Sequence, residues 1–593
     1  MALIYDVLFD SQTRALSLLD KSGNVISSCE VPSKSNELTL TATADNSSVK
    51  LTKVGTLDNT FEVDKGNGWE GYAFGTVIPL NAGESCRWRC KSHPTTQSDT
   101  NYVQFVTTGT VEASGNCNSM LNSDFENLTS LTGYDYAFYN LFRGCTALTR
   151  APKLPATALA SNCYANMFAS CSSLTQAPKL PSTILASFCY WNMFDFCSSL
   201  TQAPELPATA LASHCYWNMF GSCSSLTQAP KLPATNLASD CYASMFSYCT
   251  RLTQAPELPA TNLASSCYSH MFRKCTSLIR APELHASTLA TSCYFGMFLD
   301  CSALTHAPSL PATTLANSCY REMFYRCTSL VEAPSLPATT LANYCYYEMF
   351  QGCGALTHAP SLPATTLADS CYMEMFQDCR ALTQAPSLPA TTLADSCYYK
   401  MFYRCESLVQ APELPALSIP DSLIYNRTNV RGCYVSMFEG CTSLEQAPAL
   451  PATALGKGSY VRMFYGCRSL VKAPELPATS LPDVLNSGGT SGPAFGCYSD
   501  MFGECRSLVK APALPATTLG GSCYGWMFYN CTSLNEIRVS ATDISADRCT
   551  MSWLQGVSST GDFYCNPDTA WSTGVSGIPS GWTRHALADY PQT

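Results

Sequence analysis

The sequence predicts a repeat solenoid, with a short parallel strand and a short helix in each unit, preceded by a small all-β sandwich domain. The main observation is that the pattern C-Y-x-x-M-F-x-x-C-x-x-L-x-x-A-P-x-L-P-A-T-x-L-A recurs every 26 residues through most of this 593-residue chain. A fixed period of this length is typical of stacked units, none of which can bury its apolar face alone. The second observation is that residues 36–115 lack the pattern and alternate in polarity like short strands.

Each repeat is expected to begin with an amphipathic helix. When the segment from Cys163 to Leu174 is placed at about 100° per residue, its constant side chains fall on one side and its variable side chains on the other. The constant positions of this unit are Cys163, Tyr164, Met167, Phe168, Cys171 and Leu174. These columns therefore predict the buried core of the solenoid.

The second half of each repeat is expected to be a short strand or extended rung of a curved parallel sheet. Leu174, Ala177 and Leu180 follow one another at a spacing of three, which suits one inward-facing side. Pro178 and Pro181 end any long regular element, because proline lacks a backbone N–H.

These units resemble the BspA-like leucine-rich repeats of bacterial surface proteins, which are marked by C-x-S-L, L-P and F-x-x-C. The segment CTSLVEAPSLPATTLANYCYYEMFQGC, from Cys327 to Cys353, carries all three marks. It departs from the family in a slightly longer unit and in Met-Phe where the family has Ala-Phe. The resemblance covers residues 145 to about 550 and implies a solenoid used for adhesion.

The chain is expected to divide into four parts. Residues 1–35 form an N-terminal docking segment with a hairpin around Lys21–Asn24, and residues 36–115 form an immunoglobulin-like β-sandwich. The solenoid follows at 116–548, and residues 549–593 form a C-terminal cap.

The cap contains four large aromatic residues that are expected to cover the last exposed rung of the solenoid. They are Trp553, Phe563, Trp571 and Trp582. The alternative is that these aromatic residues form a sugar-binding site.

Two insertions enter the repeat at the same register, at residues 416–432 and 478–496, and lengthen it by ten and twelve residues. Insertions at one register emerge on one face, which is often the binding face. Tolerated surface loops are the alternative.

The cysteine pattern indicates a structural role. Of the 34 cysteines, 14 occupy the Cys-Tyr column and 15 the Met-Phe-x-x-Cys column. We expect buried free thiols, because the two cysteines of a unit lie about 12 Å apart along a helix, too far for a disulfide. A ladder of disulfides between units is the alternative. Zinc is disfavoured, since Cys86 and Cys90 have no second pair nearby and are expected to alternate with Trp88 on a strand.

The sequence predicts no enzyme, cofactor or metal site. It contains no H-E-x-x-H, no Walker loop and no EF-hand loop, and its seven histidines have no nucleophile and acid at a recognisable spacing. The net charge of −10 disfavours nucleic acids and anionic membranes as partners, and no run of 18 apolar residues predicts membrane insertion.

Two sets of variable residues are candidates for ligand binding. The first is the divergent middle of a polar stripe, two residues after the rung leucine, and comprises Arg280, His306, Glu332 and His358. A ladder of side chains that only stabilises stacking is the alternative. The second is a group of aromatic residues at positions expected to be exposed, and comprises Trp191, Trp217, Tyr325, Tyr347, Tyr399 and Tyr403. Packing between adjacent repeats is the alternative for these.

The start of the chain shows no secretory signal, because Asp6, Asp10 and Arg14 interrupt its apolar run. We therefore expect a bacteriophage fibre or appendage that assembles in the bacterial cytoplasm and docks to other virion proteins through residues 1–115. Its solenoid would contact a glycan or protein on the host surface, and the chain would form a homo-oligomer, with a trimer as one option. A bacterial surface adhesin is the first alternative, and a structural decoration protein of the virion is the second.

Overall fold

The computed structural model describes residues 6–10, 15–19, 25–30, 36–91, 97–426, 429–483, 485–486 and 494–590. At the N-terminal end, β1 (Asp6–Asp10), β2 (Ala15–Leu19) and β3 (Val25–Glu30) form an antiparallel sheet in that order. The antiparallel pairing of β2 with β3 agrees with the expected hairpin, while its connecting residues 20–24 lie outside the described residues.

The β-rich domain expected after residue 36 is present as two sheets. One has the strand order β10-β5-β8, and the other has the order β12-β11-β4-β9-β6-β7. In β9, Cys86, Trp88 and Cys90 are buried and alternate with Arg87 and Arg89, as the spacing predicts. The strands are β4 (Leu38–Ala42), β5 (Ser47–Val54), β6 (Phe61–Asp64), β7 (Trp69–Tyr72), β8 (Ile78–Leu80), β9 (Ser85–Cys90), β10 (Tyr102–Thr108), β11 (Val111–Ser114) and β12 (Leu148–Arg150).

The β-rich domain and the solenoid share one sheet and one core. Strand β11 pairs in parallel with β12, which belongs to the first rung of the solenoid. The ring of Phe105 in β10 stacks on Phe142 of the solenoid at 5.2 Å, and Phe142 stacks in turn on Phe168. The β-rich domain therefore caps the N-terminal end of the repeat array, which would otherwise expose an apolar rung.

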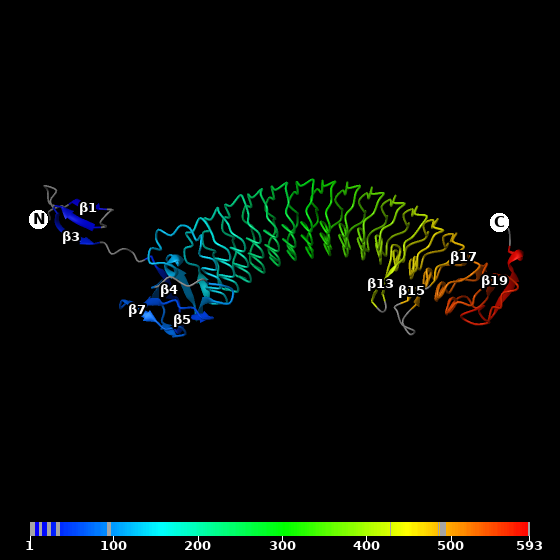
Figure 1. The fold of residues 1–593 in the computed structure, drawn as a ribbon, viewed down its shortest axis with the longest axis horizontal. Helices are drawn as coiled ribbons and strands as arrows, with labels where there is room; N and C mark the ends of the chain where they lie inside the picture. Colours follow the sequence, from blue (N-terminus) through cyan, green and yellow to red (C-terminus); the bar gives the residue numbers. More distant parts are fainter. Residues whose placement is uncertain are drawn as a thin grey trace.

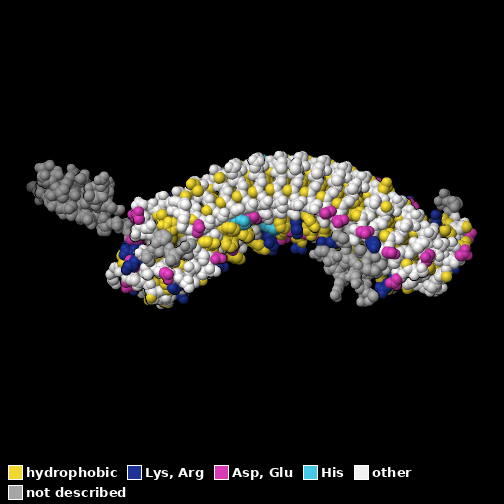
Figure 2. All heavy atoms as spheres, in the orientation of Figure 1, with side chains coloured by type: hydrophobic (Ala, Val, Ile, Leu, Met, Phe, Trp, Pro, Cys, Tyr) yellow, Lys and Arg dark blue, Asp and Glu magenta, His cyan; other side chains and the backbone are white. Residues whose placement is uncertain are grey.

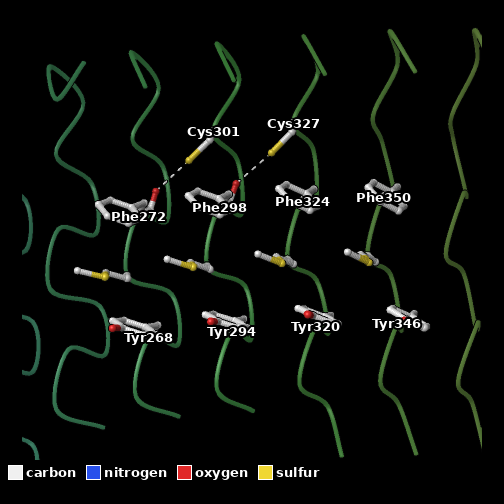
Figure 3. Close-up of a cluster of buried hydrophobic side chains, with 14 of the residues drawn as sticks. Tyr268, Phe272, Tyr294, Phe298, Cys301, Tyr320, Phe324, Cys327, Tyr346 and Phe350 are labelled. Atoms are coloured by element: carbon white, nitrogen blue, oxygen red, sulfur yellow. Dashed lines mark hydrogen bonds between the residues drawn. The ribbon is translucent and has the colours of Figure 1, made fainter. Parts of the chain in front are cut away.

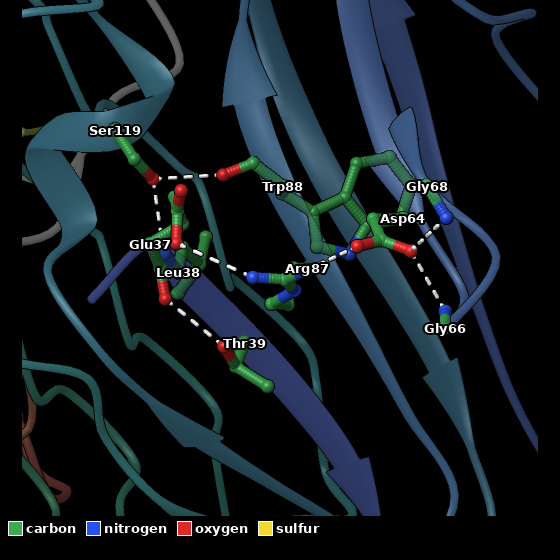
Figure 4. Close-up of polar contacts among 9 residues, drawn as sticks. All are labelled: Glu37, Leu38, Thr39, Asp64, Gly66, Gly68, Arg87, Trp88 and Ser119. Atoms are coloured by element: carbon green, nitrogen blue, oxygen red, sulfur yellow. Dashed lines mark hydrogen bonds and ion pairs between the residues drawn. The ribbon is translucent and has the colours of Figure 1, made fainter. Parts of the chain in front are cut away.

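Polar contacts fix this junction (Figure 4). In the short helix η1 (Cys117–Met120), the Ser119 hydroxyl donates to the Trp88 carbonyl at 2.8 Å and accepts from the Leu38 amide at 3.0 Å. Nearby, Arg87 pairs with the buried carboxylate of Asp64. Burial alone would raise the pKa of Asp64, but hydrogen bonds from Gly66, Arg87 and Gly68 outweigh burial and lower this pKa.

The amphipathic helix expected in each repeat is not formed. The prediction of a strand and a helix in each unit was therefore wrong about the helix. Every fourth residue of the segment has a positive φ, with 56° at Asn162, 55° at Asn166 and 63° at Ser170, which a right-handed helix does not allow. The segment is instead a run of tight turns, which we call the turn ribbon, and every described repeat contains it.

Hydrogen bonds explain why the turn ribbon replaces a helix. Its amides alternate between two partners: the Met167 N–H donates to the Tyr164 carbonyl at 3.2 Å, closing a turn, and the Phe168 N–H donates to the Met193 carbonyl of the next repeat at 2.9 Å. Adjacent ribbons thus lie close enough to bond directly, whereas packed helices keep their axes about 8–10 Å apart. The ribbon's period of four residues resembles the helical 3.6, so both structures bury the same columns.

The rungs expected as short strands are also reduced, in most repeats, to single paired residues. Parallel bridges join Gln202 to Gln228 and Arg280 to His306, for example, but regular strands do not extend from them. The prolines of the A-P-x-L-P segment account for this, because each removes a donor from the ladder. In Figure 1 the stacked repeats form one continuous arc.

Regular strands form at the C-terminal end, where only the first of the last four strands contains a proline, Pro512. The sequence Glu536–Val539 contains none, and the last strands form a parallel sheet in the order β17-β18-β19-β20. These strands are β17 (Lys510–Leu514), β18 (Glu536–Val539), β19 (Gly561–Cys565) and β20 (Trp582–Ala586), followed by η2 (Leu587–Asp589). The two insertions form small hairpins, from β13 (Leu423–Asn426) with β14 (Asn429–Arg431) and from β15 (Leu485–Asn486) with β16 (Ala494–Phe495).

The constant columns form the core, as expected from the sequence. Cys163, Met167, Phe168, Cys171 and Leu174 are fully buried, and Tyr164 is 1% exposed. Equivalent rings stack along the solenoid, with Tyr294 and Tyr320 5.8 Å apart and Phe298 and Phe324 5.6 Å apart (Figure 3).

The cysteine of the Met-Phe-x-x-Cys column has a specific partner. The Cys327 thiol donates to the Phe298 carbonyl of the preceding repeat at 3.1 Å, a contact that recurs in successive repeats (Figure 3). The cysteines for which side chains are described are free and buried, in agreement with the expectation of buried thiols.

Candidate functional site

The polar stripe lies where adjacent rungs pair. Parallel bridges join Arg280 to His306, His306 to Glu332 and Glu332 to His358, and all four side chains are exposed. Each of the two histidines is held by the preceding threonine, since the His306 Nδ1 lies 2.8 Å from the Thr305 hydroxyl and the His358 Nδ1 lies 2.9 Å from the Thr357 hydroxyl. A recess of about 350 Å³ lies beside His306 and Glu332. The stripe is therefore a continuous polar surface, with no convergent set of groups at its middle.

The tryptophans of the aromatic set stack on each other. Trp191 and Trp217 belong to adjacent turn ribbons, and their rings lie 5.8 Å apart. Phe188 packs edge-on against Trp191 and stacks on His214 at 4.3 Å. All four side chains are half-buried, so packing between repeats uses much of their surface.

The tyrosines of the aromatic set lie against cations. The Arg321 guanidinium lies 4.8 Å from the ring centre of Tyr347, and the Lys400 ammonium lies 5.0 Å from that of Tyr403. Tyr325 contacts Arg326 in the same way, at 5.2 Å. Such contacts contribute roughly 0.5–1 kcal/mol at exposed positions. Figure 2 shows hydrophobic, basic and histidine side chains gathered along the concave side of the arc.

The expectation that Tyr399 is exposed was wrong, because its side chain is only 5% exposed. It belongs to a small apolar cluster with Met373, Val430, Val435 and Val461. Val430 comes from the first insertion, and Phe495 of the second insertion packs against the same cluster. Val430 and Phe495 therefore pack over the same turn ribbons, in agreement with the expectation that the two insertions emerge on one face.

Carboxylates that the sequence did not single out have raised pKa values. Glu322, Glu348 and Glu374 occupy one column in three successive ribbons. Burial and the adjacent Glu374 raise the pKa of Glu348 to about 7. Burial also raises the pKa of Asp500, two repeats from the C-terminal cap, to about 6. The sequence shows these residues only as three glutamates at a spacing of 26. This spacing indicates raised pKa values only if that column is known to be half-buried.

The thiols are poor nucleophiles. Burial raises the pKa of Cys189 and of Cys353 to about 12, so very little thiolate forms near neutral pH. Within the described ranges, no group of three or more His, Cys, Asp or Glu residues could hold a metal ion. The same part of the chain has no helix of sufficient length and apolar character to cross a membrane.

The aromatic residues at the C-terminal end are packed inside the cap. Trp553 is fully buried and continues the tyrosine stack, since its ring lies 6.1 Å from Tyr524. Trp571 stacks on Trp553 at 5.5 Å, and Phe563 packs edge-on against Trp571. Trp582 is 8% exposed, and its ring N–H donates to the Ser558 carbonyl at 2.7 Å. This packing favours the cap over a sugar site formed by these residues.

The fold and surface define a solenoid repeat protein whose constant columns are internal and whose variable columns form the exterior. Residues 241–383 match the model of the BspA type Leucine rich repeat region in six copies. The repeats between residues 241 and 383 are therefore BspA-type leucine-rich repeats, as the resemblance of Cys327–Cys353 indicated. Such repeats suggest a surface or adhesion-type protein, and proteins that carry them are typically found at the cell surface or outside the cell. Comparison with curated proteins and with solved structures found no match.

Proposed function

We propose that this chain is a non-enzymatic adhesion protein of a bacteriophage particle, in which the solenoid is displayed to the host and residues 1–115 attach the chain to other virion proteins. The observation that carries the adhesive role is the BspA-type repeat array, with invariant buried columns and variable exterior columns. A solenoid of this kind offers an extended surface that can vary without disturbing its core.

The cysteines support folding inside a reducing compartment, as expected of a virion protein that assembles in the host cytoplasm. Equivalent thiols recur along the solenoid, and those described are buried and free. A chain that folded in an oxidising compartment would expose many unpaired thiols to disulfide formation before the core closed. A chain that folds in the cytoplasm and is released by host lysis has already buried its thiols before it meets an oxidising environment.

Mass spectrometry of purified phage particles tests the location. We expect tryptic peptides from both the solenoid and the β-rich domain in intact particles. Recovery of the chain only from a bacterial outer-membrane fraction would contradict the proposal and favour a bacterial surface adhesin.

Deletion of residues 1–35 tests the attachment. Among the residues whose side chains the structure describes, the shared core of the β-rich domain and the solenoid begins at Leu38, so we expect the shortened chain to fold but to be missing from particles. Normal incorporation of the shortened chain would contradict the docking role. Incorporation of the full chain without binding to any host cell would favour a decoration protein.

A further inference from the structure

A recess on the turn ribbons near the C-terminal end is distinguished by its lining. It has a volume of about 530 Å³, within the range of about 300–1,000 Å³ that is usual for ligand sites. Its lining combines aromatic side chains with charged and amide side chains: Tyr465, Phe495, Asp500, Trp526, Tyr529, Arg548 and Gln555, together with Ser499 and Ser522.

Small residues create this recess. At the column that holds tryptophan or tyrosine in four earlier repeats and valine in the two repeats just before, two successive repeats carry Ser499 and Gly525. Gly503 lies between Tyr465 and Tyr529 in another column, and a Cβ atom at this glycine would lie 2.7 Å from the Tyr465 ring. The Tyr465 ring therefore lies across Gly503, and the absence of larger side chains leaves space between the aromatic residues.

The polar groups of the recess have few partners of their own. Among the described residues, no donor hydrogen bonds to the half-buried carboxylate of Asp500, although burial there makes an unpaired charge costly. The Arg548 guanidinium has only a 3.9 Å contact with Asp547 in the described part of the chain. By contrast, the Ser499 hydroxyl is fully used, because it donates to the Ser522 carbonyl and accepts from the Gly496 amide.

The recess continues into a second one of about 240 Å³, which shares Phe495 and Asp500 with the first. The second recess is also lined by Tyr399, Tyr403 and Arg462. Phe495 belongs to the second insertion, so that insertion forms part of the wall of both recesses. Together they suit an extended ligand made of similar units better than a single compact molecule.

We propose that this recess binds a short oligosaccharide, and that it is the receptor contact of the proposed adhesion function, on which this inference rests. A sugar ring presents an apolar C–H face, which packs on the rings of Trp526 and Tyr529 beside the edge of Tyr465, because the Arg462 guanidinium already lies over the Tyr465 ring, 4.1 Å from its centre. Its hydroxyl groups donate to the Asp500 carboxylate and accept from Arg548 and the Gln555 amide. A nucleic acid is disfavoured by the net charge of −10.

Binding of the full-length chain to defined oligosaccharides tests the proposal. The probes are the trimers of glucose (β1-4 and α1-4), N-acetylglucosamine, mannose and xylose, together with sialyllactose, measured by isothermal titration calorimetry. We expect saturable binding of at least one probe, and at least tenfold weaker binding by Trp526→Ala and by Asp500→Asn. Phe196→Ala, which removes an aromatic side chain that is 58% exposed in a distant ribbon, should bind normally. The melting temperature of each variant shows whether it has folded.

Asp500→Asn preserves shape, so it keeps the test decisive if Trp526→Ala is unstable. Failure of the wild-type chain to bind any probe, or unchanged binding by folded Asp500→Asn and Trp526→Ala, would overturn the oligosaccharide site. A parallel assay with intact host cells separates the two proposals. Cell binding that survives both substitutions overturns the site and leaves adhesion standing, whereas oligosaccharide binding without cell binding overturns adhesion.

Discussion

Replacing Glu348 by glutamine should stabilise the protein at pH 8 and leave it unchanged at pH 4.5. Glu348 lies between Glu322 and Glu374 in one column of the turn ribbons, and burial together with Glu374 raises its pKa from 4.5 to about 7. A carboxyl whose pKa is higher in the folded state than in the unfolded state binds its proton more tightly when folded. Its favourable contribution is therefore complete below about pH 4.5 and is lost as the pH rises through 7.

The size of the effect follows from the pKa change. A change from 4.5 to about 7 corresponds to about 3 kcal/mol, at about 1.4 kcal/mol for each tenfold change in proton affinity. Because Glu348 is only partly buried, solvent screening reduces this value, and we expect about 1–2 kcal/mol.

Urea unfolding of the wild type and Glu348→Gln at pH 4.5, 6, 7 and 8 measures this difference. Glu332→Gln, which makes the same substitution at an exposed position of the polar stripe, is a matched control. Equal stability of Glu348→Gln and the wild type at pH 8, or the same gain in stability at pH 4.5 as at pH 8, would contradict a raised pKa of Glu348 in the folded protein.

Three further predictions concern the core. Iodoacetamide at pH 8 should leave Cys353 unlabelled in the native protein and label it after unfolding, because with a pKa of about 12 only about one thiol in ten thousand is ionised. Peptide mass spectrometry measures the labelling, and a labelled Cys353 in the native protein would contradict this prediction. Phe298→Ala should lower the free energy of unfolding by about 3–5 kcal/mol, since it breaks a stack with Phe272 and Phe324, and should divide the urea transition into two steps. A loss below about 1 kcal/mol would show that the stack is not needed for stability. Trp553→Ala should speed hydrogen exchange in residues 523–590 but not in 241–383, and uniform acceleration would show that the cap acts on the whole array.

The buried columns could be predicted from the sequence, whereas the backbone that carries them could not. Cys163, Met167 and Phe168 are buried as expected because a four-residue turn period and a 3.6-residue helical period place nearly the same side chains on one face. The positive φ at Asn166 depends on hydrogen bonds to the next repeat, which a pattern within one repeat does not contain.

The candidate surface was only partly predictable, because some of its contacts also depend on residues outside the repeat pattern. The polar stripe through His306 and Glu332 follows from register alone, and the structure pairs these residues as expected. The burial of Tyr399 and the recess at Trp526 depend on how Val430 and Phe495 of the insertions fold over the ribbons. Such contacts join residues outside the periodic pattern, so the repeat gives no indication of them.

On the proposed function, the constant columns maintain the fold and the variable surface recognises the host. Flow cytometry of the labelled full-length chain on intact host cells separates these two roles, with a triple alanine variant at Tyr465, Trp526 and Tyr529 and with Phe298→Ala. We expect the triple variant to keep its melting temperature within a few degrees but to lose cell binding. We expect Phe298→Ala to melt at a lower temperature but still to bind cells well below that temperature. Saturable cell binding by the folded triple variant, equal to that of the wild type, would contradict recognition through this surface.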